Sequence, residues 1–251
     1  MASHRISFLI FCLSYIFVVT TVSFCDFTQS KRKQIPIRVL NKEIIKKSTT
    51  ITVKIKLENT AGSGVLINKK QHIYSVITNR HIIDREEKYY IQTPDAHLYK
   101  GKLVTSSEDE DLAILEFVSE RNYGVATLSN SSLELRENLF AVGFPFNSNQ
   151  LIISSGKLIM QLDKPLKYGY QIGYTNEIQK GMSGGAILNS LGEVVGVNGR
   201  TANPIIPNYQ FYDGSYPNDA LQQQMILLSW GIPINNVKLN NIKTRKNLNE
   251  K

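Results

Sequence analysis

A serine set among glycines, in the stretch Gly181-Met-Ser-Gly-Gly185, is the side chain of this sequence best suited to nucleophilic chemistry. A serine hydroxyl becomes a useful nucleophile only when a neighbouring base takes its proton and an acid orients that base. Glycines also gather in ordinary tight turns, so the turn alone is weak evidence. All the histidines precede Ser183 in the chain: His4, His72, His81 and His97. A base for this serine must therefore come from earlier in the sequence.

The order of these groups along the chain separates the known arrangements of a serine triad. The motif G-x-S-x-G also occurs in α/β-hydrolases, but there the acid and the histidine follow the serine. In the subtilisin order the acid precedes the histidine, and the only aspartate before His81 is Asp26, next to a predicted processing site. The order that remains is histidine, acid, serine, which is the order of the chymotrypsin-like fold.

His81 is the best candidate for the base. It follows the apolar run Tyr74–Thr78, so we expect it where a buried strand ends, whereas His72 and His97 fall in turn-like segments that suit the surface. A histidine in such a position is often structural. The context T-N-R-H-I-I, with G-S-G-V-L-I upstream, resembles the catalytic histidine of bacterial trypsin-like and HtrA-like proteases. The resemblance implies that His81 is the general base.

Asp111 is the best candidate for the acid. It ends the acidic run Glu108–Asp111, and we predict it as the first residue of the strand "DLAILEF". The apolar residues that follow bring its carboxylate to the edge of the core, while the rest of the run suits a solvated turn. The pattern D-L-A-I-L matches the catalytic aspartate of the same family, 30 residues after His81. A buried carboxylate there fixes the tautomer of the imidazole and stabilises the imidazolium.

The resemblance covers about Thr50 to Val237 and implies two perpendicular six-stranded antiparallel β-barrels with the triad in the cleft. It implies that Ser183 is the nucleophile and that the N–H groups of Gly181 and Ser183 form the oxyanion hole. The chain departs from animal trypsins at Met182, where those enzymes carry an aspartate that receives the new N-terminus on activation. We therefore do not expect that activation route.

The elements that must position these groups are short strands. Alternating runs such as "TVKIKL", "YSVIT", "YYIQT", "NLFAVGF" and "EVVGVNG" are separated by turn signals, which predicts an all-β domain. We place the domain at 48–238, with a first barrel at about 48–120 and a second at about 125–238. Helical periodicity is confined to "NDALQQQMILLSW" and the C-terminus.

The two ends of the chain differ from the domain in composition. Residues 1–25 have a basic start and then a long uncharged run, which predicts a cleaved signal peptide or a retained membrane anchor. The net charge is +8, but residues 48–234 hold 16 Lys and Arg against 18 Asp and Glu, so the positive charge lies in a basic lead-in, 26–47, and a basic tail, 239–251. We expect solvated flanks and no nucleic-acid partner.

Both cysteines, Cys12 and Cys25, lie in the N-terminal segment, so we expect no disulfide within the domain and no thiolate metal site. These features predict an exported serine endopeptidase that needs no metal or cofactor and takes protein or peptide substrates. Two alternatives remain open: a catalytically silent barrel protein that binds peptides or a partner, and an esterase with the same triad.

The resemblance also implies where the specificity pocket lies. In the trypsin-like proteases that the chain resembles, the base of the primary pocket lies six residues before the serine, which here is Glu177. Fifteen residues after Ser183 stands Asn198, where the resembling glutamate-specific proteases carry a histidine. An acidic pocket base without that imidazole would disfavour Glu and Asp and tolerate Lys or Arg. The alternative is that Glu177 points to solvent and that the stretch Thr201–Ser229 supplies much of the recognition.

Overall fold

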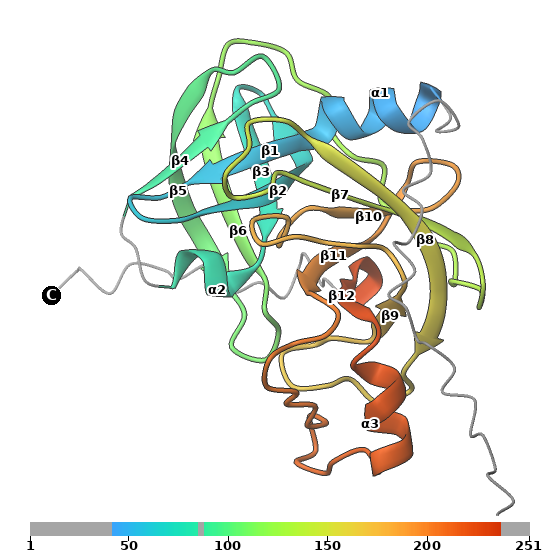
Figure 1. Cartoon of the computed structure of the whole chain (residues 1–251). Coiled ribbons are helices and arrows are strands. Elements are labelled where there is room, and N and C mark those ends of the chain that lie inside the picture. The colour runs from blue at the N-terminus through green and yellow to red at the C-terminus, as the bar shows by residue number, and fades with distance from the viewer. Residues whose placement is uncertain (1–41, 85–87, 237–251) are drawn as a thin grey trace, which may run out of the picture. The chain divides into compact units, whose positions relative to one another are not determined.

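Six antiparallel strands of the N-terminal half of the domain close into one barrel in the computed structural model, which describes residues 42–84 and 88–236 (Figure 1). The order around the barrel is β1-β2-β3-β6-β5-β4. The strands are β1 (Thr52–Lys56), β2 (Ala61–Lys70), β3 (Ile73–Thr78), β4 (Tyr89–Gln92), β5 (Leu98–Ser106) and β6 (Ala113–Val118). Their inward side chains, among them Val53, Ile55 and Leu115, form one buried cluster. The interior of the barrel is thus a packed apolar core.

The second barrel repeats this arrangement with the order β10-β11-β12-β9-β8-β7. Its strands are β7 (Asn138–Gly143), β8 (Ile152–Gln161), β9 (Ile172–Tyr174), β10 (Ala186–Leu188), β11 (Val194–Arg200) and β12 (Ser229–Pro233). Every strand pairing in both barrels is antiparallel. The prediction of two six-stranded antiparallel barrels is therefore confirmed.

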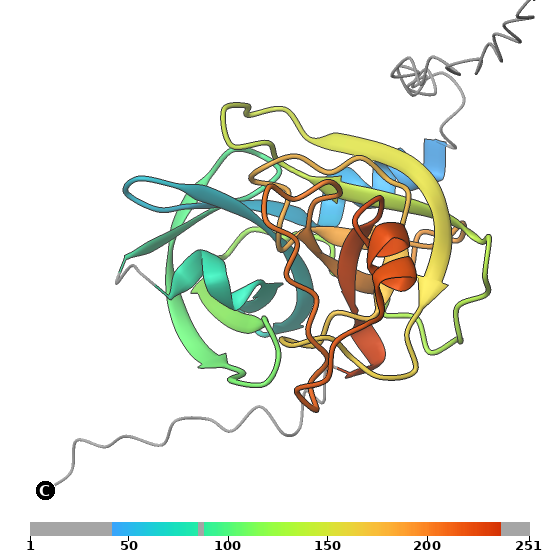
Figure 2. The ribbon, with the colours of Figure 1, turned by 60° about the horizontal axis from the view of Figure 1, so that its bottom comes forward.

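The two barrels lie side by side and share apolar packing (Figures 1 and 2). One buried cluster contains Val65 and Ile77 from the first barrel together with Val142, Ala186 and Val197 from the second. Removing apolar surface of this kind from water is the main source of folding stability. The packing fixes the two barrels against each other, and so fixes any site that takes residues from both.

Three helices and one 3-10 turn complete the described chain: α1 (Lys42–Ile51), α2 (Arg80–Ile83), α3 (Asp219–Met225) and η2 (Ile234–Asn236). Helix α1 buries Ile44, Ser48 and Ile51, which lie on one helical face. Lys47 Nζ in α1 donates to the carbonyl of Leu191 at 2.6 Å. The sequence did not predict this helix, which begins inside the segment that we had interpreted as a basic lead-in.

The ends of the chain lie outside the described residues, so the signal peptide or membrane anchor at 1–25 and the tail at 239–251 remain predictions. Among the residues that the structure describes, no helix is long and apolar enough to span a membrane. In the same residues no group of three or more His, Cys, Asp or Glu side chains is arranged to hold a metal ion.

Candidate active site

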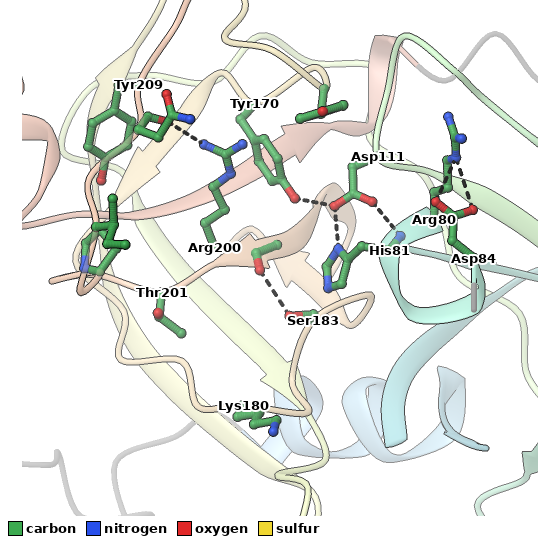
Figure 3. Close-up of a pocket in the computed structure, with 15 residues that line it drawn as sticks. Arg80, His81, Asp84, Asp111, Tyr170, Lys180, Ser183, Arg200, Thr201 and Tyr209 are labelled. Carbon is green, nitrogen blue, oxygen red and sulfur yellow. Dashed lines mark hydrogen bonds and ion pairs between the residues drawn. The ribbon is translucent and has the colours of Figure 1, made fainter. Parts of the chain in front are cut away.

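A cleft of about 760 Å³ contains His81, Asp111 and Ser183 on its walls (Figure 3). His81 lies in α2, directly after β3, and Asp111 lies two residues before β6 begins, so both come from the first barrel. Ser183 precedes β10 in the second barrel. Residues that are separated by up to 102 positions in the sequence are thus brought to one place.

Both oxygens of the Asp111 carboxylate lie within hydrogen-bonding distance of His81. The backbone N–H of His81 donates to Oδ1 at 2.8 Å, and the imidazole Nδ1 lies 2.6 Å from Oδ2. The Asp111 side chain is 9% exposed, whereas that of His81 is 50% exposed. A carboxylate beside Nδ1 favours the tautomer with the proton on that nitrogen, which leaves Nε2 as the acceptor on the open side of the ring.

The strand ends around Asp111 fix its position. The buried side chain of Asn79 donates from Nδ2 to the Asp111 carbonyl at 2.8 Å, and the backbone N–H of Asp111 donates to the carbonyl of Tyr168 at 3.0 Å. The first contact comes from the end of β3 and the second from the second barrel. The predicted strand that starts at Asp111 in fact begins at Ala113, because these contacts hold Asp111 in a bend.

A third side chain, Tyr170 from the second barrel, donates its hydroxyl to Asp111 Oδ2. Tyr170 is 2% exposed, and its ring packs against Gly199, where a Cβ atom would lie 2.1 Å from Tyr170 Cε1. Burial first, and then the nearby Asp111 carboxylate, raise the pKa of the Tyr170 phenol well above its ordinary value. The phenol therefore keeps its proton and remains the donor to Asp111.

The Ser183 turn carries the groups expected of a nucleophile loop. The Ser183 hydroxyl donates to the carbonyl of Gly199 at 3.0 Å. Gly184 has a φ of +83°, and a Cβ atom there would lie 2.2 Å from the carbonyl oxygen of Ser63. Only glycine allows both this backbone conformation and this close approach.

Contacts around the turn also orient two backbone N–H groups. Phe146 N donates to the carbonyl of Lys180 at 2.8 Å, and Gly185 N donates to the carbonyl of Met182 at 3.1 Å. In a trans peptide the N–H points away from the preceding carbonyl oxygen, so the N–H groups of Gly181 and Ser183 point away from these donors. Neither of them donates to another group in the described part of the chain.

Ser63 in β2 holds this turn from the other barrel. Its backbone N–H donates to the carbonyl of Ser183 at 2.9 Å, and its hydroxyl donates to the carbonyl of Gly181 at 2.8 Å. The hydroxyl in turn accepts from the N–H of Phe144 at 2.8 Å, and Ser63 is fully buried. One small buried side chain thus joins β2, the segment after β7 and the nucleophile turn.

The two residues predicted for the specificity pocket lie elsewhere. Glu177 is exposed and does not line the cleft. Asn198 is fully buried, and its amide accepts from Tyr174 and donates to the carbonyls of Val142 and Ala186. Asn198 therefore braces the interior of the second barrel, and the structure does not bring it together with Glu177 in the cleft.

Sequence reasoning missed Tyr170 and Ser63, which support the site, and Lys180 and Arg200, which line it. No local motif marks Tyr170 and Ser63, because each contacts a residue that is far away in the sequence. We expect the stretch after β11 to contribute, and five of its residues line the cleft: Thr201, Pro204, Ile206, Asn208 and Tyr209.

Comparison with known proteins agrees with the two-barrel fold. The family model for the trypsin-like peptidase domain matches residues 62–197. The chain therefore belongs to the family of trypsin-like peptidase domains, as the resemblance to bacterial HtrA-like proteases indicated.

The individual relatives are bacterial proteases. Serine endoprotease DegS of Haemophilus influenzae is 29% identical over 178 residues, which cover 66% of this chain and 51% of that protein. The periplasmic pH-dependent serine endoprotease DegQ of Escherichia coli is 31% identical over 143 residues, which cover 55% of this chain and 30% of that protein. The chain thus spans about half the length of the first relative and less than a third of the second.

A solved structure supports the fold. The crystal structure of a serine endoprotease from Yersinia pestis superimposes with a TM-score of 0.60 at 21% identity, covering 77% of this chain and 62% of that one. At this identity the likeness concerns the arrangement of the two barrels.

Proposed function

We propose that this chain is a serine endopeptidase that cleaves peptide bonds through an acyl-enzyme, with His81, Asp111 and Ser183 as its catalytic triad. The observation that carries the proposal is the bond of His81 Nδ1 to the buried Asp111 carboxylate in the cleft that also holds Ser183. Membership of the trypsin-like peptidase family supports it, as do the relatives that are named serine endoproteases.

In this mechanism His81 Nε2 takes the proton of Ser183 as Oγ attacks the scissile carbonyl. Rotation about the Cα–Cβ bond of Ser183 moves its hydroxyl from the Gly199 carbonyl towards the imidazole. The C–N bond of the substrate then breaks, and His81 gives the proton to the leaving amine. Water, activated by the same imidazole, hydrolyses the acyl-enzyme and releases the acid.

The backbone N–H groups of Gly181 and Ser183 are the proposed donors to the oxyanion of the tetrahedral intermediate. Both are free of other acceptors in the described chain, and the carbonyl bonds around them hold the turn in shape. Loss of one such donor typically costs about 3 kcal/mol of transition-state stabilisation.

The test compares wild-type protein with a Ser183→Ala variant. Wild-type protein should react with a serine-directed fluorophosphonate and hydrolyse casein, while Ser183→Ala should do neither and keep its fold by circular dichroism. A panel of simple esters in the same assay separates a peptidase from an esterase. Folded wild-type protein that neither reacts with the probe nor cleaves any substrate would favour a silent barrel that binds peptides.

We also propose that the protein is exported, because its N-terminal composition is that of a signal peptide and relatives such as DegQ are described as periplasmic. The mature form should begin near Phe24 to Phe27, which N-terminal sequencing of the exported protein tests. Recovery of only the intact chain, in membranes, would indicate an anchor.

A further inference from the structure

The charged side chains of the cleft leave an excess of positive charge. Besides His81, the cleft is lined by Arg80, Asp84, Asp111, Lys180 and Arg200. Asp84 is paired with Arg80 at 3.1 Å, and the Asp111 carboxylate belongs to the triad. Within residues 42–84 and 88–236, neither Lys180 nor Arg200 has a carboxylate partner. The excess is local, since the domain as a whole has slightly more acidic than basic residues.

Two contacts fix the position of the Arg200 guanidinium. Its guanidinium lies 4.5 Å over the centre of the Tyr170 ring, and Nη1 donates to the carbonyl of Asn208 at 3.2 Å. Its backbone is in β11, where Arg200 pairs with Trp230 of β12. A guanidinium has five N–H groups in a planar fork, so most of them remain for a ligand. Holding the fork in advance lowers the entropy cost of binding.

The position of Arg200 indicates which part of a substrate it meets. Arg200, Tyr170, Asp111 and His81 form a continuous row of contacts, with the arginine and the histidine at its two ends (Figure 3). His81 gives a proton to the leaving amine, so the leaving group lies at the histidine end of the row. The acyl part of the substrate then lies towards Arg200.

We propose that Arg200 binds a carboxylate on the acyl side of the scissile bond, so that the cleft selects substrates with Glu or Asp at one position before the cut. Lys180, which precedes Gly181 of the nucleophile turn, adds a second positive charge. Its side chain is exposed, and its Nζ lies 5.2 Å over the centre of the Phe146 ring. The inference rests on the proposed function and names its substrate class. It reverses the charge preference that Glu177 suggested.

The test uses peptides in pairs that differ only by Glu against Gln, or Asp against Asn, at one position before or after the cleavage site. For a carboxylate bound by Arg200, kcat/KM should favour the acidic peptide by about 10- to 100-fold at one acyl-side position. The ratio should stay near 1 on the leaving-group side. In Arg200→Gln the ratio should fall to near 1, and in Lys180→Gln it should fall only about 2- to 3-fold, because that charge is exposed.

The ratio within each variant is the readout, because Arg200 touches Tyr170 and its removal can also change the rate. Arg80→Gln is the matched control: it removes one positive charge from the same cleft, but one that is already paired with Asp84, so the ratio should not change. A ratio near 1 at every acyl-side position, a preference for Lys, or a preference for Glu that survives in Arg200→Gln would each overturn the inference.

A binding measurement keeps this inference separate from the proposed function. The Ser183→Ala protein, with and without Arg200→Gln, is titrated with the same labelled peptides by fluorescence anisotropy. Tighter binding of the Glu peptide that depends on Arg200 supports carboxylate recognition even if the wild-type protein cuts nothing. Hydrolysis by wild-type protein without any discrimination overturns the recognition and leaves the proposed function standing.

Discussion

Replacing Tyr170 by phenylalanine should slow the reaction without changing the triad itself. The substitution removes one hydroxyl and keeps the ring that packs against Gly199 and under the Arg200 guanidinium. Asp111 would then keep two donors, the backbone N–H and the Nδ1–H of His81, and would lose the third. The carboxylate remains bound to the imidazole but is held less firmly by the second barrel.

The size of the effect follows from the kind of hydrogen bond that is lost. A buried hydrogen bond to a charged group contributes about 1.5–3 kcal/mol to stability. Part of that loss weakens the orientation of Asp111 during catalysis, and about 1.4 kcal/mol of it corresponds to a tenfold lower kcat. Because the tautomer of His81 is preserved, the loss should stay far below the roughly 10⁴-fold effect of an asparagine in place of the triad acid. KM should change little, since Tyr170 donates to the acid and Arg200 holds the substrate.

Two controls distinguish positioning from general destabilisation. Tyr74→Phe removes the hydroxyl of another buried tyrosine, which donates to the Arg121 carbonyl at 3.0 Å, and should lower stability but not kcat. In an Asp111→Asn background, Tyr170→Phe should cost little further activity, because the two changes act on one interaction. A kcat within twofold of wild type, with the expected loss of stability in urea, would refute the positioning role.

The remaining predictions concern the triad acid, the nucleophile turn and alkaline stability. Asp111→Asn should lower kcat by about 10⁴-fold with the fold intact, as steady-state kinetics on casein-derived peptides will measure. Gly184→Ala should destabilise the protein by more than the roughly 1–3 kcal/mol expected for a strained φ alone, because the new Cβ would meet the Ser63 carbonyl. The control is Gly214→Ala: Gly214 has a φ of +87°, and a Cβ there would have no atom within 4 Å, so this variant measures the cost of the backbone strain alone. Burial raises the pKa of the Tyr170 phenol, so above about pH 10 the folded state keeps a proton that the unfolded chain loses. The stability that the protonated phenol contributes is complete below about pH 10. Above that pH the free energy of unfolding falls by up to about 1.4 kcal/mol per pH unit. Urea unfolding at about pH 9 and pH 11 should therefore show a smaller alkaline loss for Tyr170→Phe than for wild type.

Most of what the sequence predicted depended on the order of His81, Asp111 and Ser183 along the chain. The order of histidine, acid and serine excluded two folds, and the resemblance of the motifs around them implied the two barrels that the structure contains. Apolar runs bounded by turn signals located strands such as β1, β3, β4, β7 and β11 within a few residues. These signals are local, and a single sequence contains them.

The elements that were missed lack such signals. Helix α1 has a mostly polar sequence, and only Ile44, Ser48 and Ile51 face the domain, so its apolar stripe is narrow. Strand β12 lies in "SWGIPI", where a proline and a glycine interrupt the alternation. The pocket was assigned by counting from Ser183, and the count reached Glu177, which is exposed. Counting along the chain assumes that loops keep their length and direction, and side-chain direction depends on packing that the sequence does not display.

The support of the site crosses between the barrels in both directions. The acid Asp111 belongs to the first barrel and is held by Tyr168 and Tyr170 of the second, while the turn of Ser183 belongs to the second and is held by Ser63 of the first. A small shift of one barrel against the other would therefore disturb the acid and the nucleophile together, since each has its anchor on the opposite side. Activity should then depend on the packing between the barrels more steeply than the stability of either barrel does. This dependence arises from contacts between residues far apart in sequence. Ser63 and Tyr170 take no part in the proposed chemistry, but they hold the nucleophile turn and the acid in place across the two barrels.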